Sequence, residues 1–385
     1  MLASRMPEEF DAAIVGGGIA GLANAWMAAR SGRSVVLFER DPQAKGASTR
    51  NFGMVWLIGQ PLGEPYELAR RSREFWLEFG GGSESWMRKC GSLHLAHHDD
   101  EWAVLQEFAA HASKAGIDVQ LCSPEETLTR SPAANPDGLR GALWSEAEVA
   151  INPRAAMNDL SSWLGAEHGV TVRTDSTVVG IDGHKLTLAD GSQCEAGRIV
   201  VCAGSDIQTL YPEVLSRPEL QLCKLQMMRT RPQPDAWRLG PLLAGGLTMH
   251  RYESFSVCSS QATLRQRISA EHPELDQFGI HTMASQFPDG SVVLGDSHEY
   301  GSPLPSSDSP QINELILREE RRMIHLPRWE IAERWHGIYL KHTKAPYLLE
   351  APADHVRIMT GLGGAGMTLS LGLAEKLWQE WGGGE

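Results

Sequence analysis

The stretch Ala12–Glu39, which reads AAIVGGGIAGLANAWMAARSGRSVVLFE, decides the fold of this chain. Its apolar start, Ala12–Val15, is short and ends at glycines, as expected of a buried parallel strand. Gly16, Gly18 and Gly21 then form the pattern GxGxxG. In this order the glycines allow a tight turn, the approach of a pyrophosphate to the backbone, and close packing of helix on strand.

The residues after the glycines complete a strand–helix–strand unit. Ile19–Arg30 predicts a helix and Ser34–Phe38 predicts a second buried strand. Glu39 follows 23 residues after the first glycine, where a carboxylate accepts hydrogen bonds from an adenosine ribose and repels a 2′-phosphate, although Arg40 beside it weakens that repulsion. This order of elements predicts a dinucleotide site, whereas glycine turns alone would fit an ordinary βαβ packing unit.

Length, composition and charge narrow the class of protein. With 385 residues, 42% of them hydrophobic and 22% charged, the chain has room for two domains and the composition of a globular protein. A net charge of −13 without basic clusters argues against nucleic acid as a partner. Six scattered cysteines predict a reducing, cytoplasmic location and no metal site. The first residues lack an apolar signal core, and the uncharged run Ala12–Ala29 contains too many glycines for a membrane span.

Periodicity along the rest of the chain predicts further elements. Helices are expected at Glu64–Phe79 (ended by Gly80–Gly82), Asp99–Ala115, Pro124–Thr129 (capped by Ser123 and Glu126), Pro153–His168 and Ile312–Ile324. A meander of hairpins is expected from Val170–Arg173, Thr177–Ile181 and Lys185–Leu188, and a buried strand from Arg198–Cys202. A second, more antiparallel sheet is expected to contain Leu222–Arg229, Phe255–Ser259 and Ser291–Leu294.

A second glycine-rich turn, Gly361–Gly366, follows the predicted strand Arg357–Thr360 and precedes a predicted helix, Met367–Trp381. The free N–H groups and the positive dipole end of that helix converge on one spot. Such a spot stabilises the negative charge that a reduced flavin carries near N1, and a nicotinamide has no comparable need. Together with GxGxxG, the turn favours FAD over NAD; a capping turn without a ligand is the alternative.

Several motifs follow one another over nearly the whole chain: GxGxxG with Glu39, ASTRNFG, INPR, VVCAGS, DGSVVLGD, WHGIY and TGLGGAGMT. Their order resembles the FAD-dependent amine and amino-acid oxidoreductases, which include glycine, sarcosine and D-amino-acid oxidases. The resemblance implies an α/β fold, with a Rossmann-like FAD-binding domain and a mixed-sheet α+β substrate domain. The implied boundaries are residues 1–80, 145–215 and 330–385 for the FAD-binding domain, and 81–144 and 216–329 for the substrate domain.

The resemblance also implies which residues bind FAD. The first glycine motif and the acid that follows it are expected to bind the ADP half of FAD. The next loop is expected to lie along the pyrophosphate and the flavin, and the second glycine turn to surround the flavin edge. The residues implied are Gly16, Gly18, Ile19, Ala20, Gly21, Glu39, Arg40, Ser48, Thr49, Arg50, Asn51, Gly53, Met54, Val55, Val178, Ala203, Gly204, Gly361, Gly363, Gly364, Gly366, Met367 and Thr368. Binding is expected to be non-covalent, because no cysteine follows Cys258 where the family attaches its flavin.

Two departures from the family pattern concern the substrate and the electron acceptor. In glycine and D-amino-acid oxidases, a WxGxR strand supplies an arginine that clasps the substrate carboxylate, and here Tyr339 stands in its place. Sarcosine-type enzymes place a lysine beside the flavin to help oxygen react, and the corresponding strand here offers Val293. The pattern therefore argues against an ordinary α-amino acid and leaves two acceptors, O2 (giving H2O2) or another.

Four sequence segments resemble one branch of this family, which is associated with bacterial phosphonate breakdown: RNFGMVW, HRYESF, WHGIY and GAGMTLS. This resemblance implies an aminophosphonate substrate related to 2-aminoethylphosphonate or its N-methyl form, oxidised by hydride transfer to flavin N5 and hydrolysis of the resulting imine. A tetrahedral, more highly charged phosphonate suits several dispersed donors. The candidate catalytic and binding donors are Arg50, Asn51, His250, Arg251, Tyr252, Tyr339, Lys341 and His342.

Two other functions fit the same sequence. One is an oxidase of a glycine- or sarcosine-like amino acid, with Arg50 and Lys341 holding the carboxylate. The other is a non-catalytic flavin-binding or electron-relay subunit. The candidate donors also have structural interpretations: His250 and Arg251 as a solvated loop pair, Lys341 as part of a strand-end surface, and the tyrosines as core aromatics.

Overall fold

The structure, a computed structural model, describes residues 8–80 and 86–382 and divides into two compact units. The first unit comprises Met1–Arg50, Arg154–Cys223 and Ile338–Glu385, and the second comprises Asn51–Pro153 and Lys224–Gly337. Each unit is assembled from separated segments. The predicted and the observed divisions differ most at residues 51–80, which the predicted boundaries assign to FAD binding and the structure groups with the second unit.

The first unit is built on a parallel sheet whose central strands run in the order β9–β2–β1–β12–β20. At its centre, Val15 of β1 lies opposite Val201 of β12 and Phe38 of β2. The strand order reverses between β1 and β12, and open α/β sheets bind ligands beyond the carboxyl ends of their strands at such a point. These strands are β1 (Glu8–Val15), β2 (Val35–Phe38), β9 (Thr171–Arg173), β12 (Gln193–Val201) and β20 (Val356–Thr360).

Antiparallel strands extend this sheet. β10 (Val178–Asp182) and β11 (Lys185–Leu188) form the predicted meander against the first half of β12, and β19 (Leu348–Ala353) pairs with β20. The prediction that Val170–Arg173 belongs to this meander is wrong, because β9 pairs in parallel with β2. A strand of three residues carries the same local signal in either pairing, and only its distant partner distinguishes them.

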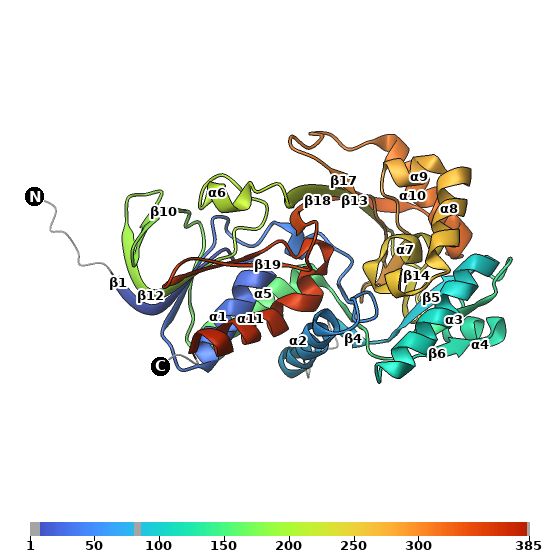
Figure 1. Ribbon diagram of the computed structural model, residues 1–385, viewed down its shortest axis with the longest axis horizontal. Helices are drawn as coiled ribbons and strands as arrows, with labels where there is room; N and C mark the ends of the chain where they lie inside the picture. The colour runs from blue at the N-terminus through green and yellow to red at the C-terminus, as the bar shows by residue number, and fades with distance from the viewer. Residues whose placement is uncertain (1–7, 81–85, 383–385) are drawn as a thin grey trace, which may run out of the picture. The chain divides into compact units, whose positions relative to one another are not determined.

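Helices α1 (Ile19–Arg30), α5 (Pro153–His168) and α11 (Gly366–Gly382) lie together under the strands of the first unit (Figure 1). The rings of Trp26 in α1 and Trp163 in α5 pack edge to face, with 4.9 Å between their centroids, and α1 also packs against α11. The fully buried Asn24 links α1 to α11, because its Oδ1 accepts a hydrogen bond of 3.1 Å from the indole N–H of Trp378. The shorter elements are α6 (Pro212–Leu215), η1 (Ala47–Thr49) and η3 (Gly363–Ala365).

The second unit contains most of a nine-stranded sheet in the order β17–β13–β16–β15–β14–β5–β7–β6, with β18 on β13, and a smaller sheet β3–β8–β4. Antiparallel pairs dominate, as predicted, and β14 with β5 is parallel. The strands are β3 (Met54–Val55), β4 (Met87–Lys89), β5 (Ser92–Ala96), β6 (Gln120–Cys122), β7 (Gly141–Ser145), β8 (Val149–Ile151), β13 (Leu220–Thr230), β14 (Leu242–Ala244), β15 (Met283–Gln286), β16 (Val292–Gly295), β17 (Glu299–Tyr300) and β18 (Ile331–His342).

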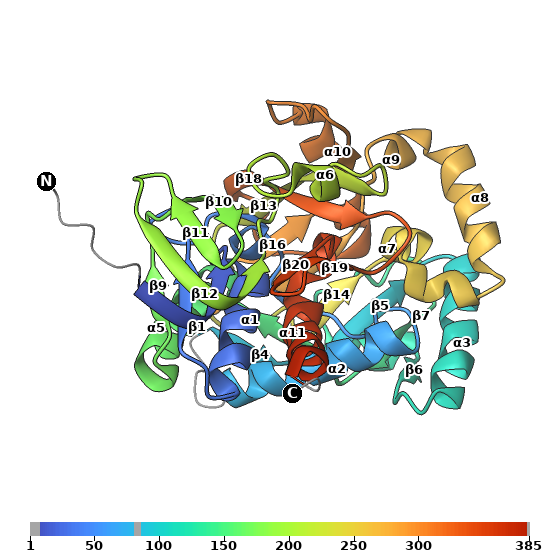
Figure 2. The same ribbon diagram turned by 60° about the vertical axis from the view of Figure 1, so that its left-hand side comes forward.

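Helices cover the larger sheet of the second unit, and α8 packs against α3 (Figure 2). The predicted cap of α4 is confirmed, since Ser123 Oγ accepts a hydrogen bond from Glu126 N and the Glu126 carboxylate accepts one from Ser123 N. The predicted strand Phe255–Ser259 is wrong, because η2 (Glu253–Val257) turns there as a 3₁₀ helix. The helices are α2 (Glu64–Gly80), α3 (Asp99–Lys114), α4 (Pro124–Arg130), α7 (Gly246–Arg251), α8 (Gln261–Glu271), α9 (Pro273–Gln277) and α10 (Pro310–Met323).

Two expectations concern the ends of helices and membrane crossing. Helix α2 continues to Gly80, and the rest of its predicted stop, Gly80–Gly82, lies outside the described residues. Within residues 8–80 and 86–382, each helix is too short or too polar to cross a bilayer.

The buried carboxyl of Glu148 makes the stability of the second unit depend on pH. Its two oxygens accept hydrogen bonds of 3.0 Å each from Ile58 N and from Ser92 Oγ. Burial is the main cause that raises the pKa of this carboxyl above its ordinary 4.5. Above about pH 4.5, the Glu148 carboxyl loses its proton in the unfolded chain but keeps it in the folded chain. The free energy of unfolding therefore falls as the pH rises.

We therefore expect Glu148→Gln, which keeps the shape and removes the titration, to lose less stability than the wild type between about pH 5 and pH 8. The difference in slope is at most about 1.4 kcal/mol per pH unit. Urea unfolding across this range measures it, and Glu9→Gln, at an exposed position of β1, serves as the control. Equal slopes for the wild type and Glu148→Gln would contradict the assignment.

Candidate functional site

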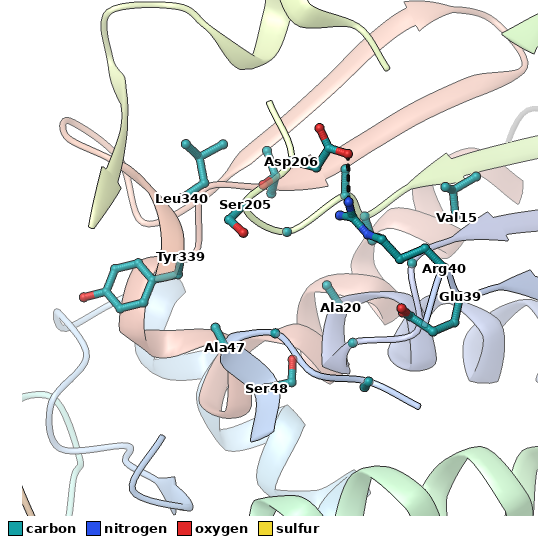
Figure 3. A pocket seen from close by; sticks show the side chains of 18 of the residues that line it. Val15, Ala20, Glu39, Arg40, Ala47, Ser48, Ser205, Asp206, Tyr339 and Leu340 are labelled. Carbon is teal, nitrogen blue, oxygen red and sulfur yellow. Dashed lines mark hydrogen bonds and ion pairs between the residues drawn. The ribbon is translucent and has the colours of Figure 1, made fainter. Parts of the chain in front are cut away.

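A pocket of about 410 Å³ opens in the first unit at the carboxyl ends of its parallel strands (Figure 3). The strands β1, β2, β12 and β20 each line the pocket with residues at, or just after, their carboxyl ends. The pocket therefore occupies the position where the strand order reverses. The contributing residues are Val15 and Gly16, Phe38 and Glu39, Cys202–Gly204, and Thr360 and Gly361.

The glycines at the start of α1 are required by close backbone contacts. Gly16 has φ +106°, and a Cβ there would lie 2.3 Å from the Cys202 carbonyl oxygen. A Cβ on Gly21 would lie 1.7 Å from the carbonyl oxygen of Gly16. A side chain at Gly16 would push the ends of β1 and β12 apart, and one at Gly21 would push α1 away from the end of β1.

Two helix N-termini meet at this pocket. Ile19 and Ala20 of α1 and Gly366 of α11 line it, and a Cβ on Gly366 would lie 3.6 Å from Ile19 Cγ2. The first N–H groups of a helix lack partners within the helix, and the helix dipole gives this end partial positive charge. Two such ends side by side favour an anionic ligand such as a pyrophosphate. Ser48 lies against the start of α1, where its Oγ accepts a hydrogen bond of 2.9 Å from Ile19 N.

One end of the pocket is acidic. Glu39 accepts hydrogen bonds from Gly17 N at 2.7 Å and from Asp41 N at 3.0 Å, one on each carboxylate oxygen. Each oxygen keeps a further lone pair for a ribose hydroxyl. Arg40 forms an ion pair of 3.1 Å with Asp206, drawn as a dashed line in Figure 3. Because this pairing neutralises the arginine, the acidic end disfavours a 2′-phosphate.

The other end of the pocket is formed where β18 meets the second glycine turn. Tyr339 stands there, opposite Glu39 and Arg40 in Figure 3. A Cβ on Gly364 would lie 3.7 Å from the Tyr339 hydroxyl, and one on Gly363 would lie 3.2 Å from Lys341 Cγ. Both side chains thus lie against this turn, but Tyr339 is buried and lines the pocket, whereas Lys341, two residues further along β18, is exposed and lies outside the lining.

The structure gathers many of the predicted cofactor-binding residues around the pocket, and others lie in the first unit outside its lining. The predicted residues in the lining are Gly16, Gly18, Ile19, Ala20, Glu39, Arg40, Ser48, Val178, Ala203, Gly204, Gly361, Gly363 and Gly366. Those in the first unit outside the lining are Gly21, Thr49, Arg50, Gly364, Met367 and Thr368. The individual contacts of these residues with a cofactor stay predictions.

Four further predicted cofactor residues, Asn51, Gly53, Met54 and Val55, belong to the second unit. Asn51 Oδ1 accepts a hydrogen bond of 2.8 Å from Gly53 N. Gly53 has φ +69°, and a Cβ there would lie 1.7 Å from the carbonyl oxygen of Ile151. These contacts shape the start of β3, and the predicted role toward FAD stays a prediction.

The predicted donors His250 and Arg251 share one carboxylate within the second unit. His250 Nε2 lies 2.7 Å from Asp276 Oδ1, and Arg251 Nη2 donates to the same oxygen at 3.0 Å. Burial lowers the pKa of the His250 imidazole, and it also lowers that of the Arg251 guanidinium. Both side chains thus connect α7 to α9, a structural role that spacing in the sequence did not indicate. Tyr252, next along the chain, is half-buried, and its ring centroid lies 5.6 Å from that of His281.

Sequence reasoning missed two pocket residues in the loop after β12. Ser205 and Asp206 line the pocket, and Asp206 Oδ1 accepts hydrogen bonds of 3.1 Å from Gln208 N and from Thr209 N. Their position just beyond a central strand was the available signal. Cys202, which was not predicted either, also lines the pocket, and burial raises the pKa of its thiol to about 12, which favours the protonated thiol.

Comparison with known proteins places the chain in a family. Residues 11–379 match the family model "FAD dependent oxidoreductase" (DAO). One of the opine oxidase subunits from Rhizobium meliloti is 26% identical over 277 residues, which are 68% of this chain and 73% of that protein. The structure of glycine oxidase from Geobacillus kaustophilus superposes with a TM-score of 0.76 at 19% identity, covering 97% of this chain and 94% of that one. Iminodiacetate oxidase from Chelativorans sp. BNC1 gives a TM-score of 0.71 at 20% identity, covering 97% and 95%.

The fold and the pocket define an α/β protein with a dinucleotide-type site. The chain belongs to the DAO family of FAD-dependent oxidoreductases, so FAD is its cofactor and the predicted fold class is confirmed. The residues present fit this cofactor, because the pocket combines close backbone approach at the glycines, two helix N-termini and an acidic end.

If Glu39 holds the ribose, we expect Glu39→Ala to weaken FAD binding by about 10- to 100-fold, since hydrogen bonds to a charged group contribute about 1.5–3 kcal/mol. Quenching of FAD fluorescence by the apoprotein measures the Kd. Asp190→Ala is the matched control, because Asp190 also accepts a hydrogen bond from a turn N–H, that of Ser192, but lies outside the pocket lining. An unchanged Kd for Glu39→Ala would refute the ribose contact.

Proposed function

We propose that this enzyme oxidises the carbon–nitrogen bond of a small anionic amine, and that the amine is an aminophosphonate related to 2-aminoethylphosphonate or its N-methyl form. We further propose that FAD is bound non-covalently and is reoxidised by O2, giving H2O2. The protein would work in the cytoplasm, where its six free cysteines would stay reduced.

The observation that carries this proposal is the pairing of Tyr339 and Lys341 against the second glycine turn. In glycine and D-amino-acid oxidases, the position of Tyr339 is held by an arginine whose planar fork fits a carboxylate. A tyrosine hydroxyl and a lysine ammonium are single-point donors instead. Single-point donors suit a tetrahedral phosphonate, whose three oxygens point in different directions and carry more charge.

The names of the related proteins support the wider class of substrate. Glycine oxidase, iminodiacetate oxidase and opine oxidase are named for small compounds, and both glycine and iminodiacetate join an amine to a carboxylate. An amine linked to an anionic group is therefore the shared chemistry that we carry over to this chain. Replacement of the carboxylate by a phosphonate is the finer part of the proposal, and it rests on Tyr339 and Lys341.

Bound FAD would supply the hydride acceptor for oxidation of the amine. The protein's residues would bind and orient the reactants. The N-termini of α1 and α11 would stabilise negative charge on the cofactor, and Lys341 would hold the substrate anion at the glycine turn. An amine that binds in its neutral form needs no side-chain base, so the main contributions of the protein are orientation and electrostatics.

A second candidate function is oxidation of a glycine- or sarcosine-like amino acid, with Lys341 and Arg50 on the carboxylate. The names of the relatives favour it. Arg50 directly follows the short η1 helix, which contains the pocket residues Ala47 and Ser48, and its Nε donates a hydrogen bond of 2.8 Å to the Lys45 carbonyl oxygen. A non-catalytic flavin-binding or electron-relay role is the third candidate.

Anaerobic reduction of the bound flavin separates these candidates. We expect 2-aminoethylphosphonate or its N-methyl form to bleach the flavin absorption band, and glycine and sarcosine to leave it unchanged. Lys341→Met should raise the KM for the phosphonate by about 10- to 100-fold, because one charge-assisted hydrogen bond is lost. Admission of O2 to the reduced enzyme, followed by an H2O2 assay, tests the acceptor.

The control is Lys344→Met, which removes an exposed lysine from the turn after β18 and should leave the KM unchanged. Bleaching by glycine or sarcosine alone would replace the phosphonate with the second candidate. Protein that holds FAD but is bleached by none of the four amines would contradict the proposed substrate class.

A further inference from the structure

Three side chains of the second unit that commonly bind metals lie close together: His281 just before β15, and Asp296 and His298 just after β16. One potential ligand atom from each lies within 4.8 Å of the others. His281 and Asp296 are buried and His298 is largely so. Two imidazoles and one carboxylate form a ligand set typical of divalent transition metals.

The backbone holds the two segments that carry these side chains together. His281 N donates to the Asp296 carbonyl oxygen at 2.8 Å, and His298 N donates to the Phe278 carbonyl oxygen at 2.9 Å. Gly279, with φ +56°, allows the close approach, because a Cβ there would lie 2.8 Å from both Cβ and the carbonyl oxygen of His298. The ligand set is therefore fixed by the fold rather than by chance proximity of mobile side chains.

A second contact orients one of the imidazoles. His298 Nδ1 lies 3.2 Å from the Gly279 carbonyl oxygen and 3.7 Å from Asp296 Oδ1, so the ring is held between these two oxygens. Ring nitrogens of metal-binding histidines are usually oriented by such contacts to a carbonyl or carboxylate oxygen. The His281 ring lies beside that of His298, with centroids 4.4 Å apart.

The carboxylate provides an independent indication that a cation fits this site. Asp296 is 6% exposed, and its Oδ1 has no hydrogen-bond partner among the described residues. The Nδ1 of His298 lies 3.7 Å from that oxygen, which is beyond hydrogen-bond distance. A buried acceptor without a partner is costly, and a cation beside it would remove that cost.

We propose that His281, Asp296 and His298 bind a divalent transition-metal ion of the zinc type. Ligand atoms around tetrahedral zinc lie about 3.3 Å apart, because zinc–nitrogen and zinc–oxygen distances are about 2.0–2.2 Å. The separation of up to 4.8 Å here would have to shorten by side-chain rotation when an ion binds, while the backbone contacts keep the three residues together. Three protein ligands leave the fourth position of the ion open to water or another small donor.

Zinc binding to the FAD-loaded enzyme, freed of metal by a chelator, tests the proposal by isothermal titration calorimetry. We expect one equivalent of Zn²⁺ to bind the wild type, and Asp296→Asn and His298→Ala each to weaken binding by about tenfold or more. His355→Ala is the matched control, because His355 lies beside His184 at a similar 4.3 Å between ring centroids, without a carboxylate in the group. It should bind zinc as the wild type does.

Zinc that binds Asp296→Asn and His298→Ala as tightly as the wild type would overturn the proposal, as would a wild type that binds none. Anomalous diffraction at the zinc edge, from wild-type crystals soaked in zinc, needs no variant and covers the case in which one fails to fold. A peak between the three side chains is the expected result, and its absence overturns the site. Neither readout depends on amine oxidation, so this test and that of the proposed function fail separately.

Discussion

The first unit depends on the contact between the end of β1 and the start of α1. There the backbones approach so closely that a Cβ on Gly21 would lie 1.7 Å from the Gly16 carbonyl oxygen. Because of this approach, the N–H groups of α1 face the carboxyl ends of the parallel strands, and α11 packs alongside with its own N-terminus at the same pocket. Glu39 lies one strand away, and it completes a site with a positive floor and an acidic edge. We therefore expect affinity for FAD to depend on this backbone packing as well as on the Glu39 side chain.

The parts of the fold that local sequence predicted well are those with a strong local signal. Helix α1 occupies Ile19–Arg30 as expected, because glycines precede it and apolar residues continue through it. The two errors concern information that is not local. Whether Thr171–Arg173 pairs with β10 or β2 depends on residues more than a hundred positions away. The alternation in Phe255–Ser259 predicted a strand, but the segment fills a short connection between α7 and α8 and turns as a 3₁₀ helix.

The candidate site shows the same limit. Residues of the two glycine motifs were predictable, because each motif adjoins a strand and a helix and so lies at the edge of the sheet. The ion pair of Arg40 with Asp206 joins positions 166 residues apart, and His250 and Arg251 meet Asp276 across an intervening helix. Such pairs decide which cations are neutralised, and no spacing rule reveals them. His281, Asp296 and His298 were overlooked for the same reason, since the loops that bring them together are separated by two strands.

The central claim is that the pocket holds the ADP half of FAD between the helix N-termini and Glu39. Competition of adenosine diphosphate and of adenosine 2′,5′-bisphosphate with FAD for the apoprotein tests it most directly, because the two compounds carry the same number of phosphates in different places. We expect adenosine diphosphate to displace FAD and the 2′,5′ isomer to be weaker by about tenfold or more, since its 2′-phosphate meets the Glu39 carboxylate. Equal displacement by both, or by neither, would contradict it.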